Sequence, residues 1–395
     1  MSKEIYDPVH DFITITPLMR QIIDTPEMQR LRDLKQLGAA HYVFPSAVHT
    51  RFAHSIGVSY LAGKIMKILQ QNQKRLQITD RTIEIARIAG LVHDIGHGPF
   101  SHLYDQHIRA RNEDNHEKRG CQLFRKMVLK YNLCLHPHEV DQIVMMINPT
   151  IQLQSYWPYQ IIANKLCQID VDKLDYIRRD CYHLGIQMCD TFTRLITKVR
   201  VVKTSTGGEV LAWPKKLEFD IFNMFATRYR LHKQIYHHHA INAYNFVIVE
   251  IMRKHRKNKG MDCWQLTDSN IICGLNEECR HLHHKLLTRD VPKLVGEKVL
   301  MKPNAGYGDN GPNPRVFLDT IVQKVEIGFS SGLTNPLYEV FYYTKNNIDI
   351  GHQSNPQENS FCVPQQFKET IVRMYTKSND FVAAQKEWDI LKQRM

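Results

Sequence analysis

The sequence predicts a mostly α-helical protein with a small C-terminal α+β lobe, on two observations. Helical patterning dominates the chain from residue 17 to about residue 300. The segments 315–329 and 337–344 are instead rich in Val, Ile, Phe and Tyr, as strands are. We therefore expect a helical core at residues 1–300 and a C-terminal α+β lobe and tail at residues 301–395.

The clearest helix of the core is predicted to begin after Thr79 and Asp80, which suit an N-cap. The residues from Ile83 to Val92 are apolar on almost every side of such a helix. A helix without a polar face is typical of the protein centre. Gly96 and Pro99 then stop the helix, so a loop opens near the middle of the molecule.

Four further segments have a predicted local structure. Lys203–Gly208 reads as a turn, Arg253–Gly260 as a basic polar loop and Pro303–Pro314 as a linker or long loop, because each is rich in polar or breaker residues. Gln365–Tyr375 returns to a helical pattern and is predicted to be the helix of the C-terminal lobe.

Composition indicates an ordinary globular protein of the cell interior. Hydrophobic residues make up 43% of the chain and charged residues 23%. The N-terminus lacks the apolar segment of a secretion signal, and no apolar stretch approaches the ~20 residues of a membrane span. Nine scattered cysteines without a CxxC pair fit reduced thiols. We expect a soluble intracellular protein, cytoplasmic or nuclear or both, with no membrane partner.

The formal net charge of +12 is concentrated in one part of the chain. Residues 191–260 contain 14 Lys or Arg against 4 Asp or Glu, a net charge of +10. Such a segment favours a polyanionic partner, either nucleic acid or nucleotide phosphates. A solvated basic face is the simpler alternative for any single residue here.

His93 and Asp94 are the most informative residues for function. They follow the apolar run of the predicted central helix. Neighbouring helical positions point roughly 100° apart, so a neutral imidazole and a carboxylate placed in this way can approach one divalent ion from two directions. The pair therefore predicts half of a metal site.

Two other interpretations of this motif compete with a metal site. His97 gives the pair a spacing like that of the zincin motif HExxH, but Asp94 is a shorter acid than Glu and Gly96 interrupts the turn. Core histidines satisfied by hydrogen bonds would explain one such residue. They explain poorly a motif that is followed by three more histidines and a second acid: His97, His102, His116 and Asp105.

Two remote residues can complete the metal site. His54 precedes the pair in the sequence and Asp172 follows it. The order His, His-Asp, Asp resembles the HD phosphohydrolase superfamily, and the resemblance implies that the metal ligands are His54, His93, Asp94 and Asp172. Two imidazoles and two carboxylates suit iron, zinc or manganese better than calcium.

A more specific resemblance covers the chain from about Lys3 to Lys377. The resemblance rests on short blocks of sequence in the helical core, and it continues at Val295-Gly-Glu and Ile371-Val-Arg-Met-Tyr. The blocks that carry the resemblance in the core are Asp7-Pro-Val-His, Ile23-Asp-Thr-Pro, Tyr42-Val-Phe-Pro, Arg51-Phe-Ala-His-Ser, His93-Asp-Ile-Gly-His-Gly-Pro-Phe-Ser-His, Asp170-Val-Asp-Lys-Leu-Asp-Tyr and Arg179-Asp-Cys-Tyr-His-Leu-Gly-Ile. They are similar to the animal SAM-domain and HD-domain-containing deoxynucleoside triphosphate triphosphohydrolases.

This resemblance implies an HD-domain helical core and an enzyme that hydrolyses a dNTP to a deoxynucleoside and inorganic triphosphate, lowering dNTP pools. We expect the SAM domain to be absent, because the first matching motif begins at residue 3. Such a reaction needs an attacking water, cations around three phosphates and an acid for the leaving 5′ oxygen. Mg²⁺ is expected to accompany the nucleotide phosphates.

The resemblance also implies catalytic residues. His102 is the proton donor at the scissile bond, and Asp105 orients it, since a hydrogen bond between them would raise the imidazole pKa. The second histidine cluster that contacts the phosphates is implied to comprise His97, His116 and Glu117.

Substrate contacts are implied in the same way. Arg51, Lys173 and Arg228 clamp the phosphates, for which guanidinium and ammonium groups are suited; the alternative for each is a surface salt bridge. The sugar and base contacts implied by the resemblance are Gln36, Leu37 and Tyr236 around the 2′ and 3′ positions, Tyr176 and Asp180 at the 3′-OH, and His232 near the base or phosphate. A tight wall rejects an added 2′-hydroxyl.

Members of this family assemble as homotetramers, as dimers of dimers, when GTP or dNTP effectors fill sites between subunits. The implied effector-binding residues are Lys3, Asp24, Gln29 and Arg32 for guanine, and Val43, Phe44, Arg194, Lys216 and Lys377 for the adjoining site. The chain departs from the family pattern at Glu4, Tyr6, Pro214 and Asp220.

The leading hypothesis is therefore a metal-dependent dNTP triphosphohydrolase regulated through oligomerisation. Another HD nucleotidase is the nearest enzymatic alternative, disfavoured by cations placed for a triphosphate. A non-catalytic regulator that binds nucleotides or single-stranded nucleic acid is the alternative from a different class, and the basic segment motivates it. A pure binder would have no need of the metal and acid residues together.

Overall fold

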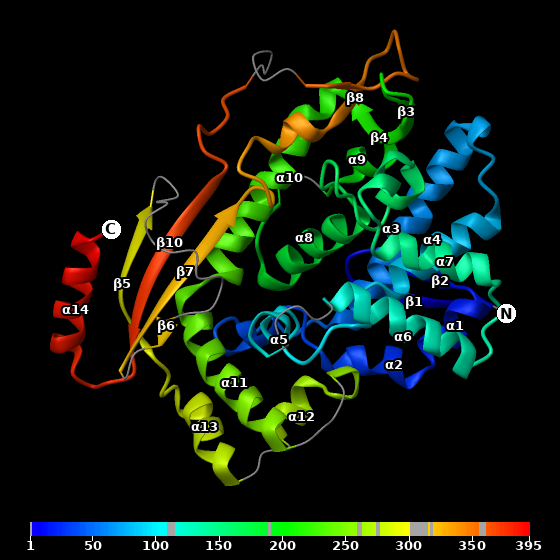
Figure 1. Cartoon of the computed structure of the whole chain (residues 1–395). Coiled ribbons are helices and arrows are strands. Elements are labelled where there is room, and N and C mark those ends of the chain that lie inside the picture. Colours follow the sequence, from blue (N-terminus) through cyan, green and yellow to red (C-terminus); the bar gives the residue numbers. More distant parts are fainter. Residues whose placement is uncertain are drawn as a thin grey trace.

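A computed structural model gives the fold of this chain. Helices dominate it, with small sheets beside them, so the predicted fold class is confirmed (Figure 1). The N- and C-termini lie at opposite ends of the molecule. The structure describes residues 2–108, 115–188, 191–258, 263–273, 277–300, 315–316, 319–354 and 361–395.

The core begins with an antiparallel hairpin of β1 (Lys3–Asp7) and β2 (Asp11–Ile15). Its α-helices are α1 (Pro17–Ile23), α2 (Pro26–Gln29), α3 (Arg51–Asn72), α4 (Asp80–Val92), α5 (His102–His107), α6 (His116–Lys130), α7 (Pro137–Ile147), α8 (Val171–Leu184), α9 (Thr193–Thr197), α10 (Glu218–Leu231), α11 (His239–Asn258), α12 (Asp268–Cys273) and α13 (Glu277–Thr288). Short 3-10 turns connect them at η1 (Arg30–Asp33), η2 (Gly38–Tyr42), η3 (Lys74–Leu76), η4 (Gln152–Ser155), η5 (Trp157–Gln160), η6 (Lys215–Leu217) and η8 (Cys263–Gln265), and η7 (His232–Tyr236) is a π-helical turn.

The predicted central helix is confirmed as α4. The Thr79 side chain accepts a hydrogen bond from the Thr82 amide (3.1 Å) and caps the helix. α4 packs against α3 and α7, and α3 also packs against α8. Gly90 allows close approach, because a Cβ there would lie 3.0 Å from the Ser59 amide nitrogen of α3. The last residue of α4, Val92, thus brings His93 to the protein centre.

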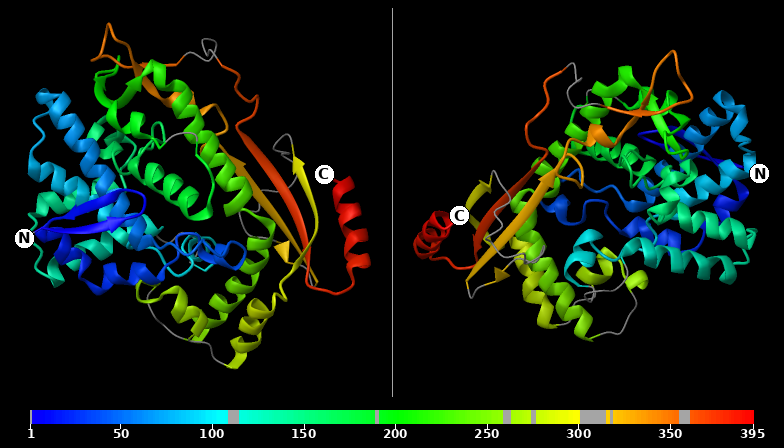
Figure 2. Two further views of the ribbon diagram at one scale, coloured as in Figure 1. Left: turned by 180° about the vertical axis from the view of Figure 1, so that it is seen from behind. Right: turned by 45° about the horizontal axis from the view of Figure 1, so that its top comes forward.

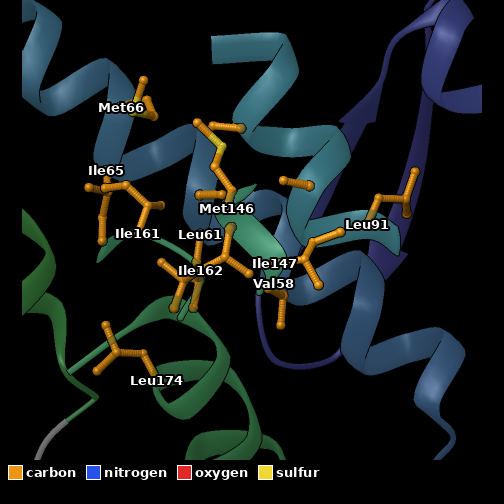
Figure 3. Close-up of a cluster of buried hydrophobic side chains, with 14 of the residues drawn as sticks. Val58, Leu61, Ile65, Met66, Leu91, Met146, Ile147, Ile161, Ile162 and Leu174 are labelled. Atoms are coloured by element: carbon orange, nitrogen blue, oxygen red, sulfur yellow. The ribbon is translucent and has the colours of Figure 1, made fainter. Parts of the chain in front are cut away.

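The interior of the core is apolar and drawn from four helices and the segment before α8. Figure 3 shows a part of it, in which the labelled side chains gather between these elements. They are Val58, Leu61, Ile65, Met66, Leu91, Met146, Ile147, Ile161, Ile162 and Leu174. Close packing of this kind gives the ends of α3, α4 and α8 fixed positions.

The larger sheet is antiparallel, in the order β5-β10-β7-β6. α14 (Phe381–Gln393) packs on its outer side, and α10 and α11 lie on the side of the core (Figures 1 and 2). Residues on both sides of position 300 therefore share this sheet. Its strands are β5 (Lys293–Leu300), β6 (Arg315–Val316), β7 (Thr320–Gly328) and β10 (Lys368–Thr376).

The second sheet, β3-β4-β8-β9, joins distant parts of the chain. β4 pairs with β8 in parallel, with Ala212 opposite Phe341. A 3-10 turn, η9 (Pro336–Glu339), leads into β8. The strands are β3 (Arg200–Lys203), β4 (Glu209–Pro214), β8 (Phe341–Tyr343) and β9 (His352–Gln353).

Two local predictions are wrong. Gln365–Tyr375 is not a helix, because all but its first three residues belong to β10, the strand between β5 and β7. A strand buried on both faces shows no alternation, so its periodicity does not distinguish it from a buried helix. Arg253–Gly260 is not a loop as far as Asn258, because α11 continues to that residue. Residues 259–260 lie outside the described residues, as do the linker residues 303–314.

Other local predictions are confirmed. The turn at Lys203–Gly208 links β3 to β4, and the Thr204 amide donates to the Gly208 carbonyl (2.8 Å). The strands predicted at 315–329 and 337–344 are present as β6, β7 and β8. Within the described ranges, no helix is long and apolar enough to cross a membrane.

Candidate active site

Three of the four predicted metal ligands form a compact group where α3, α4 and α8 meet. One ligand atom each from His54, His93 and Asp172 lies within 4.8 Å of the others. His54 lies in the first turn of α3, His93 directly follows α4, and Asp172 lies in the first turn of α8. The two histidines are buried, and the Asp172 side chain is 34% exposed. We call these residues the metal-ligand group.

The orientation of His93 leaves one ring nitrogen available. Its Nδ1 lies 2.8 Å from the Gly90 carbonyl oxygen, which can only accept, so Nδ1 donates. Its Nε2 is buried without a hydrogen-bond partner and lies 3.6 Å from Asp172 Oδ1. A buried imidazole lone pair of this kind is suited to a metal ion.

His54 is oriented by a carboxylate that the sequence interpretation missed. His54 Nδ1 lies 2.8 Å from Asp175 Oδ2, while Nε2 points to Asp172 Oδ1 at 3.0 Å. Asp175 is fully buried and also accepts hydrogen bonds from His10 Nε2 (2.6 Å) and from Arg179. Although burial acts to raise the pKa of Asp175, Arg179 and the two histidines hold it well below its usual range. The sequence signal was its position three residues after Asp172, on the same helix.

Asp94, the fourth predicted ligand, lies beside the metal-ligand group and forms an ion pair with the guanidinium of Arg51. Its Oδ1 lies 3.4 Å from His93 Nε2, and its Oδ2 lies 3.8 Å from His54 Nε2. Arg51 Nη1 donates to Asp94 Oδ2 (2.5 Å), and Arg51 Nε donates to Ser101 Oγ (2.5 Å). Arg51 is buried. Because it contacts Asp94, this predicted phosphate clamp lies next to the predicted metal site.

A second group of three histidines adjoins the first. One ring nitrogen each from His97, His102 and His116 lies within 4.8 Å of the others. His97 and His116 are stacked, with ring centroids 3.9 Å apart, and His102 meets both rings edge-on. We call these residues the histidine group. Gly96 makes it possible, because a Cβ there would lie 2.1 Å from the His116 carbonyl oxygen.

The predicted hydrogen bond between Asp105 and His102 is wrong. Asp105 Oδ2 accepts from His116 Nδ1 (2.8 Å), and Oδ1 accepts from Arg119. The pKa of His102 is not raised but falls to about 3, because protein atoms surround the ring and Arg51 lies nearby, although part of the residue is open to solvent. Arg119 comes from α6, and its charge draws Asp105 toward that helix, which sequence spacing does not reveal.

Two of the predicted sugar contacts, Tyr236 and Asp180, share a hydrogen-bonded network with His49. Tyr236 donates its hydroxyl to Asp180 Oδ2 (2.5 Å), and His49 Nε2 lies 2.6 Å from Asp180 Oδ1. The His232 ring lies 4.8 Å from that of Tyr236. Burial and the charge of Asp180 raise the pKa of Tyr236 well above its usual value, so its proton stays in place. His49 was not predicted, because 131 residues separate it from Asp180.

The remaining predicted substrate residues have the following contacts. Lys173 Nζ donates to Asp170 Oδ2 (3.1 Å), and Arg228 Nη1 donates to the Gly328 carbonyl of β7 (2.8 Å). Buried polar atoms without a hydrogen-bond partner include Gln36 Oε1 and Arg228 Nε. Tyr176 is close enough to Arg228 and Lys173 for both to act on its pKa, although burial raises it overall. Leu37 packs against the core, and Glu117 accepts from the Asn115 side chain.

The predicted effector residues lie on several elements. Arg32 Nε donates to Gln29 Oε1 (2.8 Å), and its guanidinium lies 3.7 Å from the Phe52 ring centroid. Arg194 of α9 forms a 2.8 Å ion pair with Asp220 of α10, one of the departures from the family pattern. The others are Lys3 in β1, Asp24 after α1, Val43 and Phe44 after η2, Lys216 in η6 and Lys377 after β10.

Residues 51–179 match the model of the HD domain, so the fold and the site define an HD-domain protein. The chain is 34% identical to the deoxynucleoside triphosphate triphosphohydrolase SAMHD1 of Gallus gallus, over 98% of this chain and 74% of that protein. It is 31% identical to SAMHD1 of Homo sapiens, over 96% and 71%. It is 29% identical to the SAMHD1 homolog of Dictyostelium discoideum, over 96% and 78%.

This chain belongs to the SAMHD1 family of deoxynucleoside triphosphate triphosphohydrolases. An HD domain implies a divalent metal ion, and the residues of this chain fit one. His93 Nε2 is a buried lone pair without a partner, His54 is held by Asp175, and Asp172 and Asp94 supply negative charge. Imidazole and carboxylate ligands in this number suit a divalent transition metal.

Proposed function

We propose that this chain hydrolyses dNTPs to a deoxynucleoside and inorganic triphosphate in a metal-dependent reaction, and so lowers dNTP pools. The observation that carries the proposal is the position of the metal-ligand group directly beside the histidine group, with Arg51 between them. The relatives named as deoxynucleoside triphosphate triphosphohydrolases support the same activity. We propose iron, zinc or manganese as the resident metal and Mg²⁺ with the nucleotide phosphates.

His54, His93, Asp94 and Asp172 would hold the divalent ion, which would supply positive charge at a phosphoryl group and lower the pKa of water. Arg51, Lys173 and Arg228 bind the phosphates, with Arg51 releasing part of its contact with Asp94 to do so. The water oxygen forms a bond to the α-phosphorus and loses one proton to solvent, while the bond from phosphorus to the 5′ oxygen breaks and that oxygen leaves as the 5′-hydroxyl of the deoxynucleoside.

His102 gives its proton to the leaving 5′ oxygen. In the free protein the surrounding protein atoms and the charge of Arg51 lower the pKa of His102 and so favour the neutral imidazole. Bound triphosphate brings several negative charges to this position and favours the protonated imidazole. His97, His116 and Glu117 contact the phosphates, and Asp105 acts on His116.

The network around Asp180 supports the choice of a deoxy sugar. Asp180 is buried and held by His49 and Tyr236, so its carboxylate has a fixed position for a 3′-hydroxyl, with Tyr176 next to it. Gln36, Leu37 and Tyr236 close the 2′ side of the sugar. A rigid wall at this position costs a ribonucleotide more binding energy than a soft one.

We further propose regulation by GTP or dNTP effectors that bind between subunits and stabilise a homotetramer. The proposed contacts to guanine are Lys3, Asp24, Gln29 and Arg32. The proposed contacts of the adjoining effector site are Val43, Phe44, Arg194, Lys216 and Lys377. The ion pair of Arg194 with Asp220 weakens the attraction of this site for phosphate, so we expect a weaker effector response than an unpaired arginine would give. The protein acts in the cytoplasm or nucleus, and its basic segment can also bind nucleic acid.

Purified protein incubated with each dNTP, with and without GTP or dGTP, tests the proposal. The expected products are the deoxynucleoside and intact triphosphate, and turnover should disappear after chelation and return with metal. Release of monophosphate and pyrophosphate, or no turnover after metal reconstitution, would contradict it. Light scattering in the same mixtures tests assembly, and a mass that no nucleotide changes would refute effector-driven tetramers.

A further inference from the structure

The carboxylate of Asp268 joins three separate segments of the chain. Asp268 is the first residue of α12, and only 2% of it is exposed. Its Oδ1 accepts a hydrogen bond from the Phe100 amide (2.7 Å), and its Oδ2 accepts one from the Lys35 amide (2.9 Å). The helix itself is capped by Thr267, whose Oγ1 accepts from the Asn270 amide (3.2 Å). The Asp268 carboxylate therefore serves two remote loops and not its own helix.

Both loops lead directly into the proposed site. Phe100 and Ser101 have φ values of 56° and 57°, in the left-handed region that residues with a side chain avoid. α5 begins immediately afterwards at His102, and Ser101 Oγ accepts the hydrogen bond from Arg51. Lys35 precedes Gln36 and Leu37, the proposed wall at the sugar. A turn of this conformation persists only where the surrounding structure holds it.

The start of α12 is fastened to the site by further contacts. Arg30 donates to the Leu266 carbonyl (2.9 Å) and, with its other nitrogen, to the Ile95 and His97 carbonyls (2.8 Å each). Ser269 Oγ also donates to Asp33 Oδ1 (2.6 Å), but this contact is exposed to solvent, where water competes for both groups and its contribution is small. The Phe100 and Lys35 amides and the charge of Lys35 act to lower the pKa of Asp268, but burial outweighs them and raises it to about 6. A buried carboxylate is costly unless hydrogen bonds replace its lost hydration, and the Phe100 and Lys35 amides provide these bonds to Asp268.

We propose that Asp268 is a positioning residue of the active site, which holds the Phe100–Ser101 turn and the Lys35 amide so that His102 faces the leaving oxygen and Gln36 and Leu37 close against the sugar. This inference rests on the proposed function and extends it to a residue far outside the HD motif. The two hydrogen bonds of the Asp268 carboxylate go to the Phe100 and Lys35 amides and not to the metal-ligand group. Its loss should therefore affect proton donation and sugar selection but not metal binding.

The test compares Asp268→Asn with Ser269→Ala, a control that removes a hydrogen bond from the next residue of the same helix start. An asparagine oxygen can accept from only one of the two amides, and its NH₂ group meets the other N–H. We expect Asp268→Asn to lower kcat about 10–100-fold and to reduce the preference for dNTP over the matching NTP about tenfold, with an unchanged metal content per chain. Ser269→Ala should stay within about twofold of the parent protein in each quantity.

Hydrogen exchange gives a readout that does not depend on turnover. In Asp268→Asn the Phe100 and Lys35 amides should exchange faster, while amides of α4 stay protected. If Asp268→Asn does not fold, Asp268→Glu replaces it, since the longer side chain keeps the charge but displaces the carboxylate. Unchanged kcat, selectivity and exchange in a folded variant would overturn the proposal, as would a loss of activity that follows loss of metal. A parent protein inactive on every dNTP would instead refute the proposed function, and the exchange result would still decide whether Asp268 holds the two loops.

Discussion

The metal-ligand group and the histidine group are built from similar residues, yet their surroundings suit opposite charges. Around His54, His93 and Asp172 the neighbouring side chains include the carboxylates of Asp94 and Asp175. The histidine group instead faces the guanidinium of Arg51, and Asp105 at its edge is neutralised by Arg119. A cation is therefore stabilised in the first group and an anion in the second.

The difference shows how one motif can hold a metal and a phosphate a few ångströms apart. His93 and His97 are separated by four positions, and Asp94 Oδ1 lies 3.4 Å and 3.3 Å from their Nε2 atoms, but His93 also lies near Asp172 whereas His97 also lies near Arg51. Burial and Arg51 lower the pKa of His97 well below its usual value, so its imidazole is neutral in the free protein. The spacing of the histidines alone carries none of this information, because the charges come from α3, α6 and α8.

Removal of the metal should have the largest effect. Chelation is expected to abolish dNTP turnover, since no other cation in the site can polarise the phosphoryl group and activate water together. Turnover should return on addition of iron, zinc or manganese, with released deoxynucleoside as the measurement. Full activity in a protein shown by elemental analysis to contain no transition metal would contradict the assignment of a catalytic metal ion to the metal-ligand group.

His102→Ala should have the next largest effect. Loss of a general acid is expected to lower kcat about 10²–10⁴-fold, while the metal content stays at that of the parent protein. Steady-state kinetics and elemental analysis on the same preparation measure both. Loss of metal in this variant would place His102 in the metal-ligand group and contradict the assignment.

Asp175→Asn tests the buried support of the metal-ligand group. His54 would lose the charged partner of its Nδ1, and a change of this kind typically weakens metal binding about 10–100-fold. Competition with a coloured chelator measures the affinity. Asp105→Asn is the matched change in the histidine group, and it should leave metal affinity within about twofold while lowering kcat.

The smallest effect is expected far from both groups, at Glu139. Arg81 and the His136 amide hold the pKa of Glu139 at about 2, below its usual 4.5. The stabilisation is therefore complete above pH 4.5 and is lost as the pH falls toward 2. Arg81 is partly exposed, so Glu139→Gln should lower the free energy of unfolding by only about 1 kcal/mol at pH 7.

Chemical denaturation of the parent protein and Glu139→Gln at several pH values measures this difference, which should shrink below pH 4. kcat should not change, because Arg81 lies at the opposite end of α4 from His93, roughly 18 Å away at 1.5 Å per residue. A variant with normal stability but altered kcat would mean that the site extends further than proposed.

The sequence predicted those features that local pattern controls. The Thr79 cap, the apolar run to Val92 and the stop after it placed His93 correctly at the end of a central helix. β10 was missed because a strand buried on both faces carries no alternating pattern. Apolar periodicity thus identified correctly a helix that has an N-cap in the sequence and is longer than three turns.

Contacts between distant segments were beyond local pattern. The partners of Asp105 come from α6, and the pairing of His49 with Asp180 spans 131 residues. Asp268 had no signal at all, because an aspartate after a threonine at a helix start is ordinary. Motif resemblance named many residues of the site, but only the fold shows which of them touch.

Metal content of the parent protein, His93→Ala and His102→Ala tests the central claim most directly. Each protein is purified, stripped, titrated with one transition metal and counted by elemental analysis after desalting. We expect one tightly bound ion per chain in the parent protein and in His102→Ala, and none in His93→Ala. Equal metal content in His93→Ala and the parent protein, or loss of the ion from His102→Ala alone, would contradict it.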